Sequence, residues 1–388
     1  MALGQATVRF MALSGLLVLA INGVAQIDPY HRNLVQLGYD QPLSGSGPQG
    51  IYAFYYYSNP ELVGTNTALR LAIAPVYLDG EIGFRQLISR TTDLGVGFYG
   101  GAFGDNYYEV RQGHYYKGES FYGHGGGAAL SLYQLLNPNM QIPLNLIARG
   151  GLRYALYDET SDTDKEFVLP DNRFIGFVRG GLRLAGKEPL LYADLGMEVS
   201  IWYERQWRSP SGEYGFNDDR RTEHISDLFW LYAGLDYAWT NVGHRISFAV
   251  TSGASENADR FSAWRLGGVL PLISELPLIL PGYYYEELTA KRFVHLYASY
   301  LFPLDPGHRF QFRIEAATAC AEYLEGFEQP DRWQTGVGAG LIFTPKSKRY
   351  RIVARYGYGF NALREGDRGA QSVGLLFQYD FEQGRNRR

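Results

Sequence analysis

The chain has 388 residues, with 36 Lys and Arg against 40 Asp and Glu, and a formal net charge of −4. This balance provides no strongly basic face, which argues against nucleic acid as a partner. The 47 glycines are nearly twice the usual share of about 7%, and 31 Tyr and 22 Phe accompany them. After residue 25 no run approaches eighteen consecutive apolar residues, so the sequence predicts no transmembrane helix.

The first 25 residues differ from the rest of the chain. Arg9 precedes the apolar run 10–21, and Gly23 and Ala25 place small residues at the −3 and −1 positions of a cleavage site. This pattern predicts a secretory signal peptide over 1–25, with an uncleaved N-terminal anchor as the alternative. Residues 26–33 then form a short periplasmic lead, and residues 34–388 a separate folded unit.

That unit alternates polar and apolar residues with a period of two. Between 349 and 360, for example, Arg351 and Arg355 alternate with Ile352, Ala354 and Tyr356. Such segments run to about ten residues or more, whereas strands of soluble proteins have about five or six. Tilted membrane strands need the greater length, and their backbone groups are all paired only when the sheet closes. We therefore predict an all-β fold, a transmembrane antiparallel β-barrel.

The predicted strands follow one another to the C-terminus. They lie at 34–39, 50–58, 67–78, 81–90, 92–103, 119–134, 141–157, 173–185, 190–206, 224–240, 244–254, 291–304, 308–322, 332–344, 349–360 and 370–381. Single-chain bacterial barrels have even strand numbers, so we expect sixteen strands. Fourteen is the alternative, because 67–103 can be divided differently.

The connections alternate in length from Gly104 onward. Short turns are predicted at 137–139, 186–189, 241–243, 305–307 and 345–348, and long polar loops near 104–118, 158–172, 207–223, 255–290, 323–331 and 361–369. In outer-membrane barrels the short turns face the periplasm. The sequence thus predicts a barrel in the bacterial outer membrane, in contact with its lipid, with a periplasmic C-terminus.

Charged residues on the second face of these strands are expected to line the lumen. In an open pore they set ion selectivity, and in an occluded barrel they pair with each other or with an inserted loop. A solvated interior needs no further function. The residues are Arg149, Arg153, Arg173, Arg179, Arg183, Arg313, Arg351, Arg355, Glu198 and Glu315.

The sequence gives little support to catalysis. The seven histidines lack metal-ligand spacing such as H-E-x-x-H, and no G-x-S-x-G elbow occurs. His224 near Asp227 is one weak pair, and Cys320 falls within a strand pattern. We therefore expect that the protein is not an enzyme and has no catalytic residue, no metal site and no cofactor.

The last strand has the pattern of a β-signal, by which the barrel-assembly machinery recognises a client. Its pattern of a polar residue, a glycine and spaced aromatics consists of Ser372, Gly374, Phe377, Tyr379 and Phe381. An edge strand of this kind suits pairing with another sheet. We expect that machinery as a partner during biogenesis.

A second set of residues precedes the strand at 291–304. It comprises Arg265, Gly267 and Gly268, followed by Pro281, Gly282 and Tyr283, and the strand itself ends in an apolar-Pro pattern at 301–304. Here the chain resembles the bacterial surface-antigen superfamily, the BamA/TamA type. In that family the sixth extracellular loop carries a Gly-Gly element and an Arg-Gly-aromatic tip that folds into the lumen. Strand parity places 255–290 at that loop.

Two features depart from the family pattern. Pro281 stands where the family has its tip arginine, with Arg265 as a nearby cation, and the lead before the barrel is too short for a POTRA module. The resemblance implies insertion or translocation of proteins or lipids at the outer membrane, with a periplasmic partner in place of the POTRA modules. The alternatives are a passive diffusion pore with a charged lumen and a structural accessory barrel.

Overall fold

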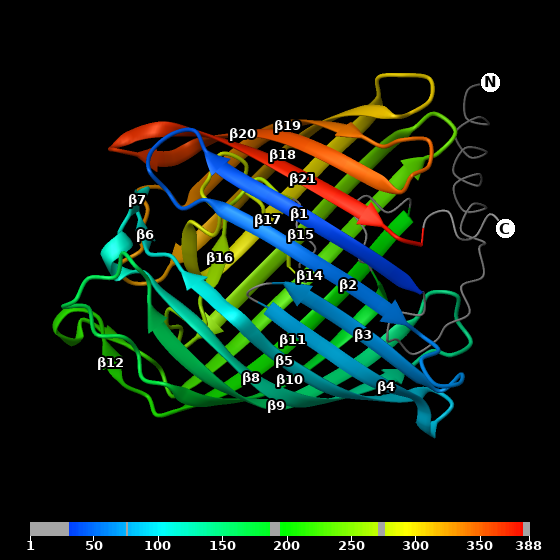
Figure 1. Ribbon diagram of the computed structural model, residues 1–388, viewed down its shortest axis with the longest axis horizontal. Helices are drawn as coiled ribbons and strands as arrows, with labels where there is room; N and C mark the ends of the chain where they lie inside the picture. Colours follow the sequence, from blue (N-terminus) through cyan, green and yellow to red (C-terminus); the bar gives the residue numbers. More distant parts are fainter. Residues whose placement is uncertain (1–30, 75–76, 187–194, 271–275, 383–388) are drawn as a thin grey trace, which may run out of the picture.

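The computed structural model describes residues 31–74, 77–186, 195–270 and 276–382, so the predicted signal peptide lies outside the described residues. Within these ranges the main sheet has 17 strands. Sixteen of them form a closed antiparallel barrel (Figure 1), and the remaining one, β16 (Trp264–Leu266), lies in a loop. No helix in the described part of the chain is long and apolar enough to cross a membrane.

The predicted number of sixteen barrel strands is confirmed, and every predicted segment overlaps one of them. The barrel strands are β1 Arg32–Pro42, β2 Gly50–Asn59, β3 Thr67–Ala74, β4 Tyr77–Ser89, β5 Thr92–Tyr107, β8 Phe121–Leu135, β9 Leu144–Glu159, β10 Arg173–Gly186, β11 Leu195–Ser209, β14 Ile225–Trp239, β15 His244–Glu256, β17 Leu288–Pro303, β18 Phe310–Tyr323, β19 Trp333–Phe343, β20 Tyr350–Arg364 and β21 Asp367–Asp380.

Two predicted boundaries were wrong. The strand predicted at 67–78 ends at Ala74, directly before Pro75, and β4 already begins at Tyr77; a proline cannot donate a ladder hydrogen bond. The long loop predicted at 361–369 is a tight turn, because β20 and β21 pair up to Arg364 and Asp367. Glu365 and Gly366 connect them with φ of 53° and 92°, the left-handed values that two-residue hairpins require.

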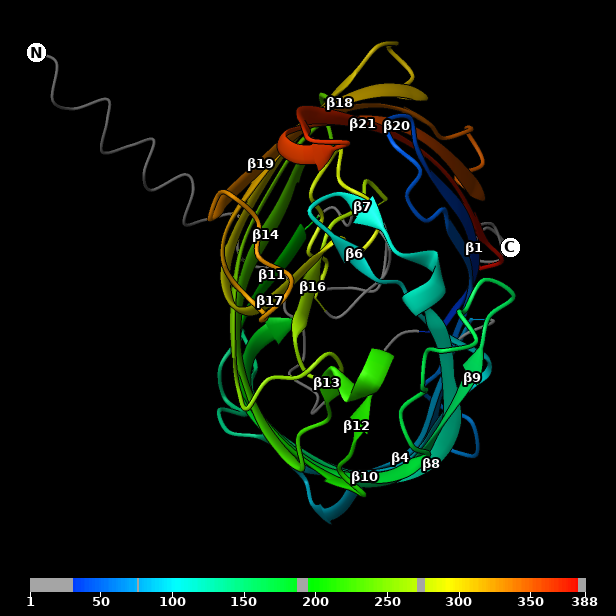
Figure 2. The same ribbon diagram turned by 90° about the vertical axis from the view of Figure 1, so that its left-hand side faces the viewer.

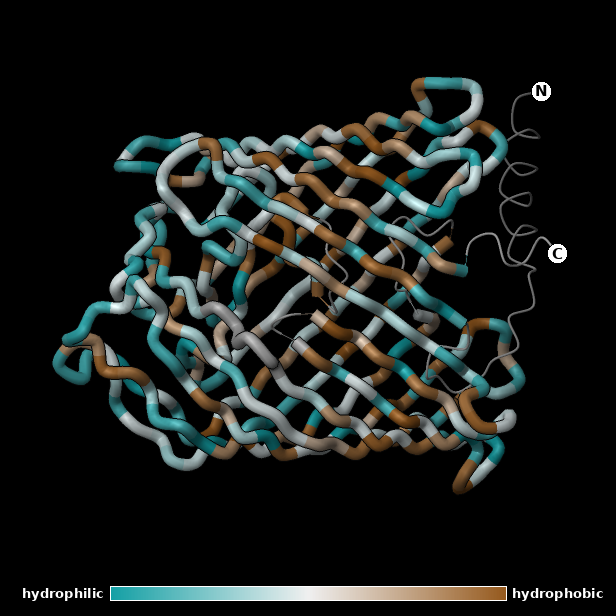
Figure 3. Tube along the Cα trace, in the orientation of Figure 1, coloured by the Kyte–Doolittle hydropathy of each residue, from teal (hydrophilic) through white to brown (hydrophobic). Residues whose placement is uncertain are grey.

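Side-chain alternation separates the two faces of the wall. Large apolar residues on the outer face, such as Leu130, Ile201, Leu341 and Leu375, are more than half exposed, as expected for side chains that meet lipid. Residues between them point inward and are polar, small or aromatic. Figure 3 shows apolar residues along the strands, with hydrophilic segments concentrated in the loops.

The two ends of the barrel differ. β1 begins and β21 ends at the same end, at the right of Figure 1, and the long loops lie at the other end. These loops carry β6 (Val110–Arg111), β7 (His114–Tyr115), η1 (Lys117–Glu119), β12 (Glu213–Tyr214), η2 (Phe216–Asp218) and β13 (Arg220–Arg221). Figure 2 shows these elements over the mouth of the barrel, with β16 inside the ring.

Pairing between β1 and β21 closes the barrel. Nine residue pairs join these strands, from Leu34↔Asp380 to Pro42↔Ser372, and nine pairs also join β1 to β2. The ladder between β2 and β3 has only five pairs, from Tyr55↔Ile73 to Asn59↔Leu69, the fewest between neighbouring barrel strands in the described residues. The closing seam is therefore as well paired as its neighbour.

Candidate functional site: the sixth loop against the inner wall

The sixth of the loops at the long-loop end of the barrel connects β15 to β17, and its described residues, 257–270 and 276–287, turn back into the barrel. β16 pairs antiparallel with the start of β17, Trp264 opposite Ala290 and Leu266 opposite Leu288. Figure 2 shows the segment inside the ring of strands. The described parts of the loop then contact the inner wall at the three places set out below.

The first contact is at the seam between β1 and β21. The Val269 amide donates to a carboxylate oxygen of Asp40 on β1 at 2.9 Å, and the Val269 carbonyl accepts from Arg355 at 2.7 Å. Leu270 packs with Leu301, Ile342, Val353 and Leu376. Gly38 on β1 and Gly374 on β21 leave room for Leu270, because an added Cβ would lie 3.0 Å and 2.6 Å from it. One loop segment thus contacts both seam strands.

The second contact is the loop tip, Leu280–Tyr283, which lies over inward-facing glycines of β19 and β20. A Cβ at Gly336 would lie 2.2 Å from the Pro281 carbonyl oxygen, and one at Gly357 would lie 2.5 Å from the Gly282 amide nitrogen. Gly282 has a φ of 89° and closely approaches Gly359. Glycine is therefore required on both sides of this contact.

Hydrogen bonds hold the same tip. The Gly282 amide donates to the Ser372 hydroxyl on β21 at 3.2 Å, and the buried Tyr283 hydroxyl donates to the Gln334 side-chain oxygen at 2.8 Å. Burial raises the pKa of the Tyr283 phenol, and the nearby Glu287 carboxylate raises it further. The phenol is therefore a protonated donor at neutral pH.

The cation at the tip comes from the wall, not from the loop. Arg364 on β20 contacts the Glu287 carboxylate at 2.8 and 2.9 Å and donates to the Gly282 carbonyl at 3.3 Å. Its guanidinium carbon lies 3.5 Å from the centroid of the Tyr284 ring. Arg265, the cation considered from the sequence, pairs with Glu286 of its own loop at 2.5 Å.

The third contact lies beside a buried ion-pair cluster of the wall. Glu315 on β18 pairs with Arg355 on β20 and with Arg313, the latter at 3.6 Å. The Tyr297 hydroxyl donates to Glu315 at 2.5 Å. Nearby, His295 on β17 contacts the Ile279 carbonyl of the loop at 2.8 Å through Nε2. The charges of this part of the wall therefore pair with one another in a buried position.

Of the other predicted lumen charges, Arg351 lies on β20 near the other end of the packed wall, whereas Arg149, Arg153, Arg173, Arg179, Arg183 and Glu198 lie on β9–β11; Arg173 is fully buried and the others are only partly buried. Arg149 pairs with Asp79 at 3.1 Å and Arg179 with Glu204 at 2.6 Å. Glu198 accepts from Ser200 at 2.9 Å, and Arg351 donates to Thr344 at 3.3 Å. Arg153 and Arg183 make no ion pair within the described residues.

The predicted β-signal residues all lie on or directly after β21. Ser372 and Gly374 face inward and contact the loop as described above. Phe377 and Tyr379 lie on the other face, opposite Leu37 and Val35 of β1, and the exposed Phe381 packs edge-on against Tyr379. The strand thus presents one face to the loop and the other to lipid.

Loops at the end of the barrel that carries the long loops form a second packed layer. Arg260 of the sixth loop pairs with Glu109 at 3.1 Å, and Arg220 pairs with Glu109 and Glu119. Burial opposes the charge of Arg220, but these carboxylates outweigh it and raise its pKa. Beneath them lies an aromatic cluster of Phe121, Tyr157, Phe167, Tyr214 and Phe261.

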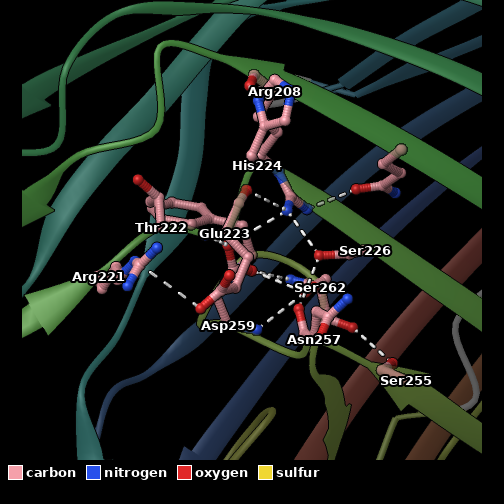
Figure 4. Close-up of polar contacts among 12 residues, drawn as sticks. Arg208, Arg221, Thr222, Glu223, His224, Ser226, Ser255, Asn257, Asp259 and Ser262 are labelled. Atoms are coloured by element: carbon pink, nitrogen blue, oxygen red, sulfur yellow. Dashed lines mark hydrogen bonds and ion pairs between the residues drawn. The ribbon is translucent and has the colours of Figure 1, made fainter.

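His224 and Asp227 point to different partners. The His224 ring nitrogen Nδ1 contacts the Arg208 carbonyl at 2.5 Å, as Figure 4 shows. Asp227 pairs with Arg205 at 2.7 Å and accepts from Tyr203 at 2.6 Å. The structure therefore does not bring this pair together.

The sequence and the barrel were compared with known proteins. Neither a protein-family profile nor a curated protein matches the sequence. Among solved structures, the barrel is similar to CdiB from Acinetobacter baumannii, with a TM-score of 0.57 and 12% identity over 91% of this chain and 60% of that chain. BamA from Haemophilus ducreyi lacking POTRA domains 1–3 matches with a TM-score of 0.54 and 10% identity, over 89% of this chain and 70% of that chain. CdiB from Escherichia coli matches with a TM-score of 0.53 and 12% identity, over 91% of this chain and 64% of that chain.

The chain has the BamA-type barrel fold. The predicted resemblance is confirmed at this level, since identities of 10–12% show the fold alone. The chain spans less than two thirds of the length of the two CdiB chains.

Several residues of the site escaped the sequence analysis, namely Asp40, Glu287, Gln334, Arg364 and the glycines under the tip. The glycines could have been identified from the sequence, because Gly336, Gly338 and Gly340 occupy alternate positions on β19, as Gly357 and Gly359 do on β20. Inward glycines on adjacent strands indicate close approach of another backbone.

Proposed function

We propose that this protein is an outer-membrane barrel that assists the insertion or translocation of proteins or lipids through the seam between β1 and β21. The contact of Val269 and Leu270 with both seam strands carries the proposal. A loop that binds Asp40 on β1 and packs against Gly374 on β21 couples its own position to the pairing of these strands. Displacement of the loop is then expected to weaken the seam from inside.

Other features support this role. The barrel fold is that of BamA and CdiB, and β21 ends in the aromatic pattern expected of a client of the barrel-assembly machinery. The proposal includes export by a signal peptide cleaved after Ala25, outer-membrane lipid as the surrounding partner, and a periplasmic partner that presents clients. It assigns the barrel no catalytic reaction.

A disulfide across the seam tests the proposal. In a Cys320→Ser background, Gln36→Cys and Gln378→Cys place two thiols opposite each other, where the native side chains hydrogen-bond at 2.8 Å. The readout is the rate at which a urea-unfolded eight-stranded barrel folds into liposomes that contain the protein. Oxidation should abolish the acceleration over empty liposomes, and reduction should restore it.

A second disulfide serves as the matched control. Tyr56→Cys and Ala72→Cys face each other across β2 and β3, the shortest ladder of the barrel. This cross-link should leave the acceleration intact. Loss of activity with the β2–β3 cross-link but not with the seam cross-link would contradict the seam as the route.

A passive pore is the second candidate, and the partly exposed arginines Arg149 and Arg179 on the inner wall favour it. Single-channel conductance in planar bilayers separates the two functions. If the loop occludes the lumen, the wild type should show brief openings only, and deletion of Leu280–Tyr283 should produce long-lived open levels. Steady open levels in the wild type would favour the pore.

A further inference from the structure

Most arginines of the inner wall have a carboxylate partner. Arg149, Arg179, Arg355 and Arg364 pair with Asp79, Glu204, Glu315 and Glu287 respectively. Arg153 on β9 and Arg173 and Arg183 on β10 depart from this rule, since none of the three makes an ion pair within the ranges that the structure describes. Burial of an arginine without a counter-charge is costly. Arg173 is the one of the three that is fully buried, so its position needs an explanation.

Strand register brings Arg153, Arg173 and Arg208 together around Ile175. Arg153 on β9 and Arg208 on β11 both lie directly opposite Ile175 on β10, one on each side. Arg173 lies two residues from Ile175 and therefore on the same face. Directly opposite residues have Cβ atoms about 4.5–5.5 Å apart. The charges of Arg153 and Arg173 both act on the Arg208 guanidinium, and all three act on Tyr157.

Within the described ranges, Arg208 is the member of this arginine cluster that contacts a carboxylate. Its buried guanidinium contacts Asp259 at 3.2 Å, the Ser226 hydroxyl at 2.9 Å and the Gln206 side-chain oxygen at 2.5 Å, and Figure 4 shows the Ser226 and Asp259 contacts. Asp259 also accepts from the amides of Glu223, Phe261 and Ser262 and from the Ser262 hydroxyl. Among the described residues, the cluster of three arginines therefore has one carboxylate contact, that of Asp259 with Arg208.

Arg173 is the least satisfied member of the cluster. Its side chain is 1% exposed, and Nε donates to the Asp171 carbonyl at 2.9 Å. Nη1 and Nη2 are buried and have no hydrogen-bond partner among the described residues. The rings of Tyr157 and Phe261 lie 5.7 and 5.8 Å from the guanidinium carbon, which offers the charge a π face but no acceptor. Two donor nitrogens therefore remain for an oxygen ligand.

We propose that Arg153, Arg173 and Arg208 form a binding site for a small oxyanion of the inorganic phosphate or sulfate class. Such an anion has several acceptor oxygens, and guanidinium groups bind it through paired N–H donors. The half-buried Arg153 gives access from the lumen. Because Asp259 and Phe261 of the sixth loop cover the cluster, a bound anion fastens the start of that loop to β9, β10 and β11. This site is independent of the seam proposed above.

Phosphate binding to the purified barrel in detergent tests the site directly. Isothermal titration at constant ionic strength, with chloride as the replaced anion, should show saturable binding at one site per chain, and sulfate should compete. Arg173→Gln should weaken phosphate binding by at least about tenfold, as expected for the loss of charged hydrogen bonds. Arg153→Gln, at a half-buried position, provides a second variant if Arg173→Gln does not fold.

Arg183→Gln is the matched control. Arg183 lies on the same strand and face as Arg173, ten residues away, and likewise makes no ion pair within the described ranges. This variant should bind phosphate as the wild type does, and the gel mobility of the unheated protein should report an intact barrel for every variant. Absence of saturable phosphate binding to the wild type would overturn the proposal, and so would equal weakening by Arg183→Gln.

Discussion

The inner wall of this barrel has two halves that use the same chemistry in different surroundings. The packed half, formed by β1 and β17–β21, lies under the sixth loop, and the side chains of its Arg355–Glu315 pair are 1% and 0% exposed. The polar half, formed by β3–β5 and β8–β11, pairs Arg179 with Glu204, whose side chains are 27% and 6% exposed. We infer that burial by the loop, rather than the presence of an ion pair, determines how much unfolding free energy is lost when a charge is removed.

The largest expected effect comes from breaking the buried pair of the packed half. Arg355→Gln leaves Glu315 buried beside Arg313 alone and removes the hydrogen bond to the Val269 carbonyl. Loss of one partner of a buried pair costs about 3–5 kcal/mol. Urea unfolding in phospholipid vesicles, followed by tryptophan fluorescence, measures this loss.

The matched variant in the polar half is Arg179→Gln. Its pair with Glu204 is partly solvated, so the loss of unfolding free energy should stay near about 1 kcal/mol. Equal losses for Arg355→Gln and Arg179→Gln would show that the loop does not make the two halves different.

The next effect concerns the glycines beneath the loop tip. Gly336→Ala places a methyl group against the Pro281 carbonyl, a backbone atom that cannot yield. Overpacking of this kind costs about 1–3 kcal/mol, and undocking of the tip relieves it. The variant should therefore show faster proteolysis within residues 257–287 and more frequent channel openings.

Gly97→Ala is the corresponding change in the polar half. Its added methyl would meet the end of the flexible Arg149 side chain at 3.0 Å, which can move into the lumen. Proteolysis and conductance should stay at wild-type values. A Gly336→Ala barrel with an undisturbed loop would contradict the docking of the tip on this surface.

The strands of the barrel and the contacts of the sixth loop differ in how far the sequence predicts them. The sequence pattern predicted fifteen of the sixteen strands, because it reflects the repeated contrast between lipid and lumen, and the even strand number of single-chain barrels added the first strand at 34–39. The pattern failed at 361–369, where the β20–β21 hairpin extends with polar side chains and the contrast with lipid is lost. The turn was nevertheless encoded by Gly366, which adopts a positive φ.

The contacts of the sixth loop could not be predicted in the same way. They join residues far apart in the chain, as Asp40 with Val269 and Arg364 with Glu287, and no local pattern specifies such pairs. The family resemblance placed the loop in the lumen but sought the tip cation on the loop itself. In the structure the cation at the tip is Arg364 of β20. Pro281 packs its backbone against the glycines of the wall, and its side chain carries no charge.

The smallest expected effect on stability lies at Asp79 in the polar half, which pairs with both Arg70 and Arg149. Asp79→Asn should lower the unfolding free energy by about 1 kcal/mol, because the amide oxygen still accepts one of the two arginine hydrogen bonds. It removes one negative charge from the lumen, however, so a barrel opened by deletion of Leu280–Tyr283 should become more selective for anions, as measured by its reversal potential in a KCl gradient. Asp227→Asn provides the control, because Asp227 pairs with Arg205 on the outer face and its loss should leave the reversal potential unchanged. If both variants shift the potential equally, the polar half does not line the conducting path and the distinction between the two halves fails.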